Sequence, residues 1–146
     1  MRRAALARRR SASDWRLFTE AAATIVICRL SLRRRDFTKT GAWAVRPTRR
    51  VGAAPVERLV WAVEAAARRL GGVTCLCKAL ALQRMMTRAG HVSELRIGVD
   101  KSGGALLAHA WLVHDGAALV GGPEAAGYTV LAAWRSDRSE DEWRFS

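Results

Sequence analysis

Hydrophobic side chains recur at steps of three and four residues in three stretches of the first 90 residues, which predicts three amphipathic helices. The first begins near Asp14, where Ser11 has the spacing of a capping box. The second follows Pro55, a residue suited to the first turn of a helix, and ends at two consecutive glycines. Between residues 36 and 54 the pattern dissolves into glycine, proline and scattered arginine, so we expect a connector there.

The stretch from Cys75 to Ala89 predicts the helix at the centre of the molecule. Thr74 is a suitable N-cap, and Gly90 follows the last residue, as is typical of a helix end. Apolar residues cover most of the circumference instead of a single stripe. Such a helix is buried on several sides, so we expect the other elements to pack around it.

Residues after position 92 alternate between apolar and polar side chains, which predicts β-strands. The expected strands cover residues 93–99, 105–113, 117–120 and 128–134. Asp115-Gly116, between two of these strands, is a strong signal for a tight hairpin turn. Helices followed by hairpin-connected strands indicate the α+β class, with N-terminal helices packed on an antiparallel sheet.

A chain of 146 residues with 50% hydrophobic content is long enough for one domain with a real core. The pattern divides the chain into three parts. These are a basic N-terminal segment with one amphipathic helix and a linker (residues 1–54), the core (55–134) and a charged tail (135–146). We expect the tail to be mostly exposed.

The net charge of +12 is concentrated near the N-terminus, where residues 1–50 hold 14 of the 25 lysines and arginines. A field of this strength attracts polyanions, acidic peptides or an anionic membrane surface, and a solvated arginine-rich surface explains it equally well. The longest apolar run, residues 21–28 with Thr24 inside it, is too short to span a bilayer. The helix could lie on a membrane surface with residues 33–35 at its end, but packing on the main domain or on a partner is expected instead.

Cys28, Cys75 and Cys77 give no paired framework, which is typical of a cytoplasmic protein with free thiols. Cys-Leu-Cys lacks the spacing of a zinc ribbon, and no second pair completes a metal site. The Gly-Gly pairs lack the lysine and serine of a phosphate loop. Neither a metal nor a bound nucleotide is therefore expected.

Cys75 is the candidate nucleophile because it opens the predicted central helix. The unpaired amides and the helix dipole at this position favour a thiolate and can hold an oxyanion. Cys77 lies about 200° further around the helix and is expected to pack in the interior. The alternative is that Cys75 is itself a buried hydrophobic residue, as free cysteines often are.

His109 is the candidate base. Alternation along its strand places it on one face with Leu107, Trp111 and Val113, and we expect that face to meet the helix of Cys75. A histidine among apolar neighbours can also be a satisfied core residue. Trp111 is a candidate for lining a substrate groove, with core packing as the alternative.

A catalytic histidine also needs an acceptor on its second ring nitrogen. Asp115 is the nearest acid along the chain, although the Asp-Gly turn explains it without catalysis. Glu124 and Asp137 are less well placed, and a backbone carbonyl or amide can serve instead.

Several of these residues occur together in a known family. Cys-Leu-x-Lys-Ala-Leu-Ala-Leu-Gln at residues 75–83, Glu-Leu-Arg-Ile-Gly-Val at 94–99 and Ala-His-Ala-Trp at 108–111 resemble the leader peptidases of lasso peptide biosynthesis. These are the transglutaminase-like B proteins. The resemblance covers roughly residues 56–134, and the helix expected from Trp15 is similar to the family's N-terminal extension.

The resemblance implies a transglutaminase- or papain-like core in which a thiolate cleaves the bond between the leader and the core of a precursor peptide. Cys75 would be the nucleophile, and His109 the base that later protonates the leaving amine. The implied partners are the precursor peptide, a separate leader-recognition protein and an asparagine-synthetase-like macrolactam cyclase. ATP belongs to the cyclase, so no cofactor is expected here. The basic first 50 residues would contact the recognition protein, the leader or the cyclase.

Gly121 departs from the family pattern, because many relatives carry an acid on the strand after the histidine hairpin. This departure leaves open a catalytically weak or inactive scaffold of the same fold. Another amide hydrolase or an acyltransferase with a Cys-His pair is the nearest alternative enzyme. A basic nucleic-acid-binding protein would show steeply salt-dependent binding, but the chain has no recognisable nucleic-acid-reading motif.

Overall fold

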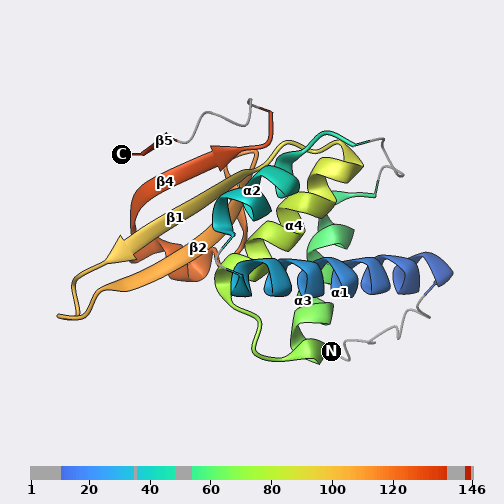
Figure 1. The fold of residues 1–146 in the computed structure, drawn as a ribbon, viewed down its shortest axis with the longest axis horizontal. Coiled ribbons are helices and arrows are strands. Elements are labelled where there is room, and N and C mark those ends of the chain that lie inside the picture. The colour runs from blue at the N-terminus through green and yellow to red at the C-terminus, as the bar shows by residue number, and fades with distance from the viewer. Residues whose placement is uncertain (1–10, 35, 49–53, 138–143, 146) are drawn as a thin grey trace, which may run out of the picture.

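The structure is a computed structural model that describes residues 11–34, 36–48, 54–137 and 144–145. The helices are α1 (Ala12–Arg33), α2 (Phe37–Val45), α3 (Val56–Leu70) and α4 (Cys75–Ala89). The strands are β1 (Glu94–Asp100), β2 (Leu107–His114), β3 (Ala117–Val120), β4 (Thr129–Arg135) and β5 (Arg144–Phe145), and the short helix η1 (Pro123–Gly127) precedes β4. The four α-helices lie together beside the sheet (Figure 1), which confirms the predicted α+β class.

The strands form one antiparallel sheet in the order β3-β2-β1-β4-β5. Leu95 pairs directly with Leu112 on one side and with Trp134 on the other, so these three side chains share a face. All three are buried in the core that the sheet forms with the helices. Gly98 pairs with His109, and this pair lies on the opposite face of the sheet because the register alternates.

Helix α4 is central, as its apolar circumference predicts: it contacts α1, α2, α3, β1 and β2. Its N-cap is Thr74, whose hydroxyl oxygen accepts a hydrogen bond from the Cys77 amide at 3.2 Å. Gly90 follows the last turn in the left-handed conformation, with φ 83°. The predicted bounds, cap and glycine stop of this helix are confirmed.

Helix α1 begins at the predicted capping box, in which Ser11 and Asp14 hydrogen-bond to each other's backbone amides. The helix packs along α3 and α4 and buries Ala21, Ile25 and Cys28 completely. Helix α1 therefore shares the core with α3 and α4.

Helix α2 lies where a connector was expected, so that prediction is wrong for residues 37–45. Its Gly41 packs directly on the ring of Trp134, and an added Cβ would overlap the ring. The helix thus covers a side chain of β4, which is distant in the sequence. A local pattern of residues cannot show this contact, because the propensity of the segment is overridden by tertiary packing. Residues 49–53 of the expected connector lie outside the described part.

The end of the chain adds a strand to the sheet that the sequence pattern did not predict. Residues 144–145 pair with β4, where Ala132 is opposite Phe145 and Ala133 is opposite Arg144. Trp143, the one tail residue expected to be covered, lies outside the described residues. Within the described part of the chain, no helix combines the length and apolar character needed to cross a bilayer.

Candidate active site

Cys75 is the first residue of α4, and its side chain is half-buried. A thiol at this position lies next to the unpaired amides of the first helical turn, which favour negative charge. The sequence predicted this position from the preceding threonine and the apolar pattern that follows it.

The other two cysteines are interior residues, as predicted for Cys77. Cys77 is only 3% exposed, and its sulfur contacts the carbonyl oxygen of Ile25 at 3.5 Å. A hydrogen bond with Cys77, together with burial, raises the pKa of the Cys28 thiol well above its usual range. Cys28 is therefore a protonated structural thiol at neutral pH.

His109 is buried on β2 and held from two directions. Its Nε2 lies 3.0 Å from the carbonyl oxygen of Gly121, which can only accept, so Nε2 carries the proton in this hydrogen bond. The imidazole stacks on Trp111 with centroids 5.9 Å apart and planes at 20°, and the ring of Tyr128 lies 5.2 Å away. In the neutral ring with a proton on Nε2, Nδ1 is the basic nitrogen.

Gly121 is needed at its position for two reasons. Its φ of +69° is strained for residues with a side chain. A Cβ on this residue would lie 2.8 Å from His109 Nε2, closer than such atoms approach in proteins. The backbone carbonyl therefore occupies the acceptor position for which an acidic side chain was expected by resemblance.

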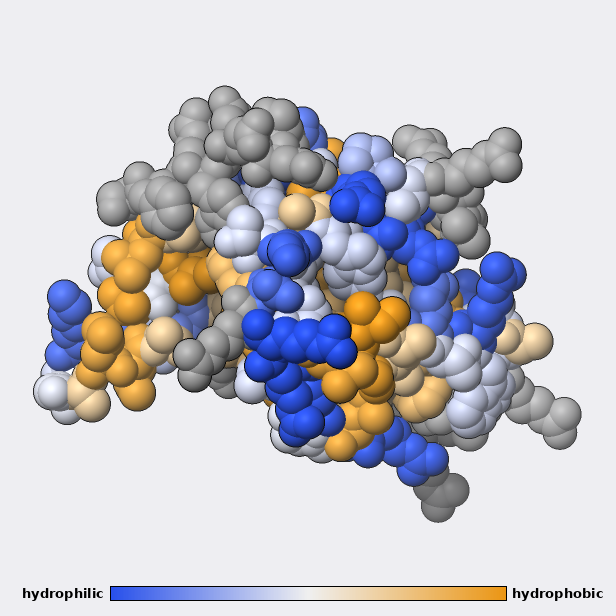
Figure 2. Space-filling model, in the orientation of Figure 1, coloured by the Kyte–Doolittle hydropathy of each residue, from blue (hydrophilic) through white to orange (hydrophobic). Residues whose placement is uncertain are grey.

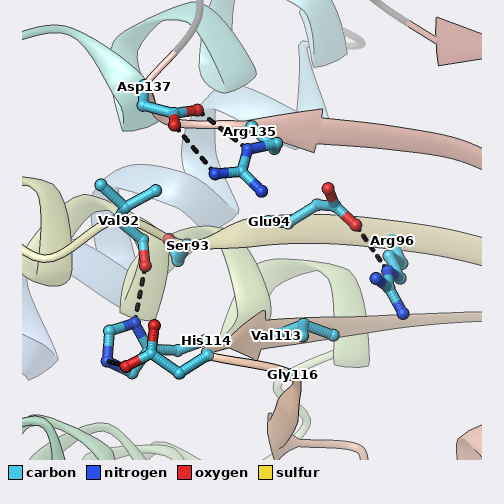
Figure 3. Close-up of a pocket in the computed structure, with 10 residues that line it drawn as sticks. Val92, Ser93, Glu94, Arg96, Val113, His114, Gly116, Arg135 and Asp137 are labelled. Atoms are coloured by element: carbon cyan, nitrogen blue, oxygen red, sulfur yellow. Dashed lines mark hydrogen bonds and ion pairs between the residues drawn. The ribbon is translucent and has the colours of Figure 1, made fainter.

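Asp115 belongs to a different part of the sheet. It occupies the hairpin turn with φ +47°, its side chain is 89% exposed, and its carboxylate lies 3.3 Å from His114 Nε2. Figure 3 shows this end of β2, where Nδ1 of His114 also bonds to the carbonyl oxygen of Val92 at 2.7 Å. The acceptor that the structure gives His109 Nε2 is thus Gly121, and the geometry does not support a catalytic role for Asp115.

The surroundings of Asp115 are a shallow cavity of about 250 Å³ on the outer face of the sheet. Its charges are largely paired, because Arg96 bonds to Glu94 at 2.6 Å and Arg135 holds Asp137 through two nitrogens (Figure 3). This cavity does not include His109 or Cys75 among its lining residues.

Trp111 is 5% exposed and packs against the histidine ring. A side chain this deeply buried positions its neighbour; it does not line an open groove. Tyr128, the only tyrosine of the chain, packs on the same two rings. Neither Tyr128 nor Gly121 was among the predicted site residues, although the glycine pair after β3 was a visible break in the pattern.

The two candidate catalytic residues approach from different sides of the sheet. Ala110 and Leu112 belong to the core shared with α4, so the alternating His109 points to the other face. The expectation that the histidine face meets the helix is therefore wrong for the body of α4. Cys75 lies at the N-terminal tip of α4.

Among the described residues, no three histidine, cysteine or acidic side chains come together as a metal site. The candidate chemical groups are a half-buried thiol beside the helix amides at the start of α4 and, on the sheet, an imidazole oriented by the Gly121 carbonyl. In one class of α+β folds, a cysteine opens a helix that packs on a sheet, and the sheet carries a histidine. Such folds can support acyl transfer through the cysteine thiol.

Comparison with known protein families identifies the superfamily of the chain. Residues 21–133, well over half of the chain, match the Transglutaminase-like superfamily, so the chain belongs to this superfamily. The superfamily includes cysteine peptidases and acyltransferases. Neither the curated proteins nor the solved structures contain a significant match.

Proposed function

We propose that this protein is a cysteine peptidase that removes the leader from a lasso precursor peptide, so that the core peptide can be cyclised by a partner enzyme. The proposal is supported by the superfamily to which the chain belongs and by the position of Cys75 at the start of a capped, buried helix. The observation that carries it is the hydrogen bond from His109 Nε2 to the Gly121 carbonyl. This bond orients the ring as the third member of a catalytic triad would.

In this mechanism Nδ1 of His109 accepts the thiol proton, and the sulfur of Cys75 attacks the carbonyl carbon of the scissile bond. The amides of the first turn of α4 stabilise the oxyanion. Collapse of the intermediate breaks the C–N bond, and the imidazolium gives its proton to the leaving amine, which is the new N-terminus of the core peptide. Water then hydrolyses the thioester on Cys75, with His109 again as the base, and releases the leader. The reaction requires the sulfur and Nδ1 to meet at the tip of α4 when substrate is bound.

The test is cleavage of a precursor peptide encoded beside this protein, with its leader-recognition protein present, followed by mass spectrometry. Replacing Cys75 by alanine should lower the cleavage rate at least roughly a thousandfold, because the covalent step is lost. Cys77→Ala is the matched control, since it removes a buried thiol two residues away, and it should keep most of the activity. Equal cleavage by the Cys75→Ala protein would contradict the proposal.

A non-catalytic scaffold of the same fold is the second candidate, and one observation favours it. The neutral carbonyl of Gly121 orients the histidine but adds no negative charge beside an imidazolium, as a carboxylate would. A scaffold would form the complex with precursor and cyclase while releasing no leader, and wild-type and Cys75→Ala proteins would then behave alike.

A further inference from the structure

A cavity of about 420 Å³ lies between the C-terminal half of α1 and the start of α4. Its lining residues come from both helices and from the loop before α4: Arg29, Leu32, Arg33, Gly72, Thr74 and Cys77. Figure 2 shows the corresponding surface, where strongly hydrophilic residues cover the end of α1 beside hydrophobic residues from earlier in the same helix.

The charge of this cavity is of one sign. Two of its lining residues are arginines, and no lining residue is acidic. Arg29 donates one Nη2 hydrogen bond to the Gly71 carbonyl at 2.5 Å, which fixes its guanidinium and leaves further N–H groups of the fork for a ligand. Arg33 is exposed, and in the described part of the chain it has no hydrogen bond or ion pair. A planar fork of donors of this kind is suited to a carboxylate.

The cavity lies at the same end of α4 as the candidate nucleophile, on the side of the helix that carries Cys77, and Cys75 is not one of its lining residues. Thr74 lines it and immediately precedes Cys75, and Cys77 closes its inner wall with a thiol that already contacts the Ile25 carbonyl. An extended peptide whose scissile bond lies at Cys75 would pass around the start of α4 before one of its side chains reached the two arginines, which at about 3.3 Å per residue takes a few residues.

We propose that this cavity, lined by Arg29 and Arg33, is a subsite for an acidic side chain of the peptide substrate, a few residues away from the cleaved bond. The inference rests on the proposed peptidase function and adds a substrate class to it. In this subsite the side chain of Leu32 and the alkyl parts of the two arginines pack along the methylene groups of a substrate glutamate. The guanidinium groups bind the carboxylate of that glutamate.

Binding is measured on the full-length Cys75→Ala protein, so that no probe is cleaved. The probes are acetyl-tetraglutamate amide and the neutral acetyl-tetraglutamine amide, followed through the arginine side-chain N–H signals in NMR spectra. The acidic peptide should shift the Arg29 and Arg33 signals, and the neutral peptide should not. Salt of about 1 M, where the Debye length is roughly 3 Å, should weaken the binding.

Arg33→Gln should reduce the affinity for the acidic probe by roughly fivefold or more, as expected for loss of a charge-assisted contact. Arg34→Gln is the matched control: it removes the same charge from the next residue, which is exposed but does not line the cavity. Its affinity should match that of the parent protein. An equal loss in both variants would show that only the diffuse positive field attracts the peptide, and would overturn the proposal.

Two competitors separate the sources of negative charge. Displacement of the acidic peptide by inorganic phosphate or by a short RNA, at concentrations lower than that of the peptide itself, would assign the cavity to phosphate groups and overturn the proposal. The subsite and the peptidase can also fail separately. Arg33-dependent binding without cleavage of any precursor by wild-type protein would keep the subsite and refute the peptidase. Cleavage with equal KM for glutamate- and glutamine-containing substrates would refute the subsite alone.

Discussion

The histidine of the candidate site is positioned by a main-chain carbonyl, and this decides how the site responds to substitution. Gly121 contributes its carbonyl oxygen only because the chain turns there with a positive φ and because no Cβ is present to collide with His109. A backbone acceptor cannot be recognised from residue types, which is why acids such as Asp115 were considered in its place. The structure supplies what the sequence could not: the direction of a carbonyl.

Replacing Gly121 by alanine should lower peptidase activity by roughly tenfold or more. The new Cβ has to displace the imidazole or the carbonyl, and a displacement of about 1 Å in a catalytic group is costly. Gly116→Ala is the matched control, because Gly116 also has a positive φ (77°) but no atom within 4 Å of the added Cβ. The measurement is the initial cleavage rate of both variants. Equal activity in the two would mean that the contact with His109 is irrelevant.

The three thiols should differ sharply in their reaction with iodoacetamide. Cys75 is half-buried at a helix start, whereas Cys28 and Cys77 are at most 3% exposed. Because the pKa of Cys28 is raised by its hydrogen bond with Cys77 and by burial, its thiolate is scarce at neutral pH. Mass spectrometry of briefly treated native protein should find the label on Cys75. A label on Cys77 at a comparable rate would contradict the assignment of the interior thiols.

Individual elements were predictable to the extent that their signals are local. The central helix has an N-cap, an apolar circumference and a glycine stop, and these fixed its bounds at Cys75–Ala89. Alternation along β2 identified the residues that share a face with His109. It could not identify which face is covered by α4, because a period of two carries no information about the packing partner. That choice depends on the whole sheet.

Helix α2 also could not be predicted from local signals, because its packing partner is Trp134 on a strand far away in the sequence. Gly41→Ala should destabilise the protein by about 1–3 kcal/mol, the usual cost of forcing an extra methyl group into a packed interface. Lys39→Ala, on the exposed side of the same helix, should change the stability by no more than about 0.5 kcal/mol. Urea unfolding of both variants measures the difference. A Gly41→Ala protein as stable as the Lys39→Ala protein would show that α2 does not pack on the ring.

At the scale of the whole molecule, the amino-terminal helices belong to the fold. Ala21, Ile25, Ala44 and Val45 are among the buried core residues, and the superfamily match begins at residue 21. The sequence pattern suggested a boundary at residue 54, because glycine, proline and scattered arginine interrupt the apolar periodicity between residues 36 and 54. Charge describes the surface of a segment, whereas the apolar positions decide whether it joins the core.

A chain that begins at residue 54 should therefore fail to fold cooperatively. It leaves the faces of α3 and α4 that contact α1 open to water, and this apolar area is too large to expose. The comparison is a chain that begins at Ser11, which keeps every described element. Near-ultraviolet circular dichroism and thermal unfolding distinguish the two. A sharp unfolding transition in the shorter chain would show that residues 54–146 are an independent domain.

An ion pair ties α1 to α3 and makes the stability depend on pH. Asp14 bonds to the Ser11 amide and to Arg58 at 2.6 Å, and both contacts lower the pKa of its carboxyl group below 3.8. Since the folded state has the lower pKa, the contribution is present above pH 3.8 and is lost as the pH falls through the lowered value. Asp14→Asn should flatten the fall in thermal stability as the pH decreases below 3.8. An unchanged slope would mean that Asp14 is not linked to folding.

The central claim is that the thiol of Cys75 and the imidazole of His109 act together at the tip of α4. The most direct test is the rate at which iodoacetamide alkylates Cys75 near neutral pH, in the parent protein and in the His109→Ala variant. The account predicts that the rate falls roughly tenfold or more without the imidazole, since the thiolate loses its proton acceptor. Identical rates in two equally stable proteins would show that the two side chains do not meet, and would contradict the account.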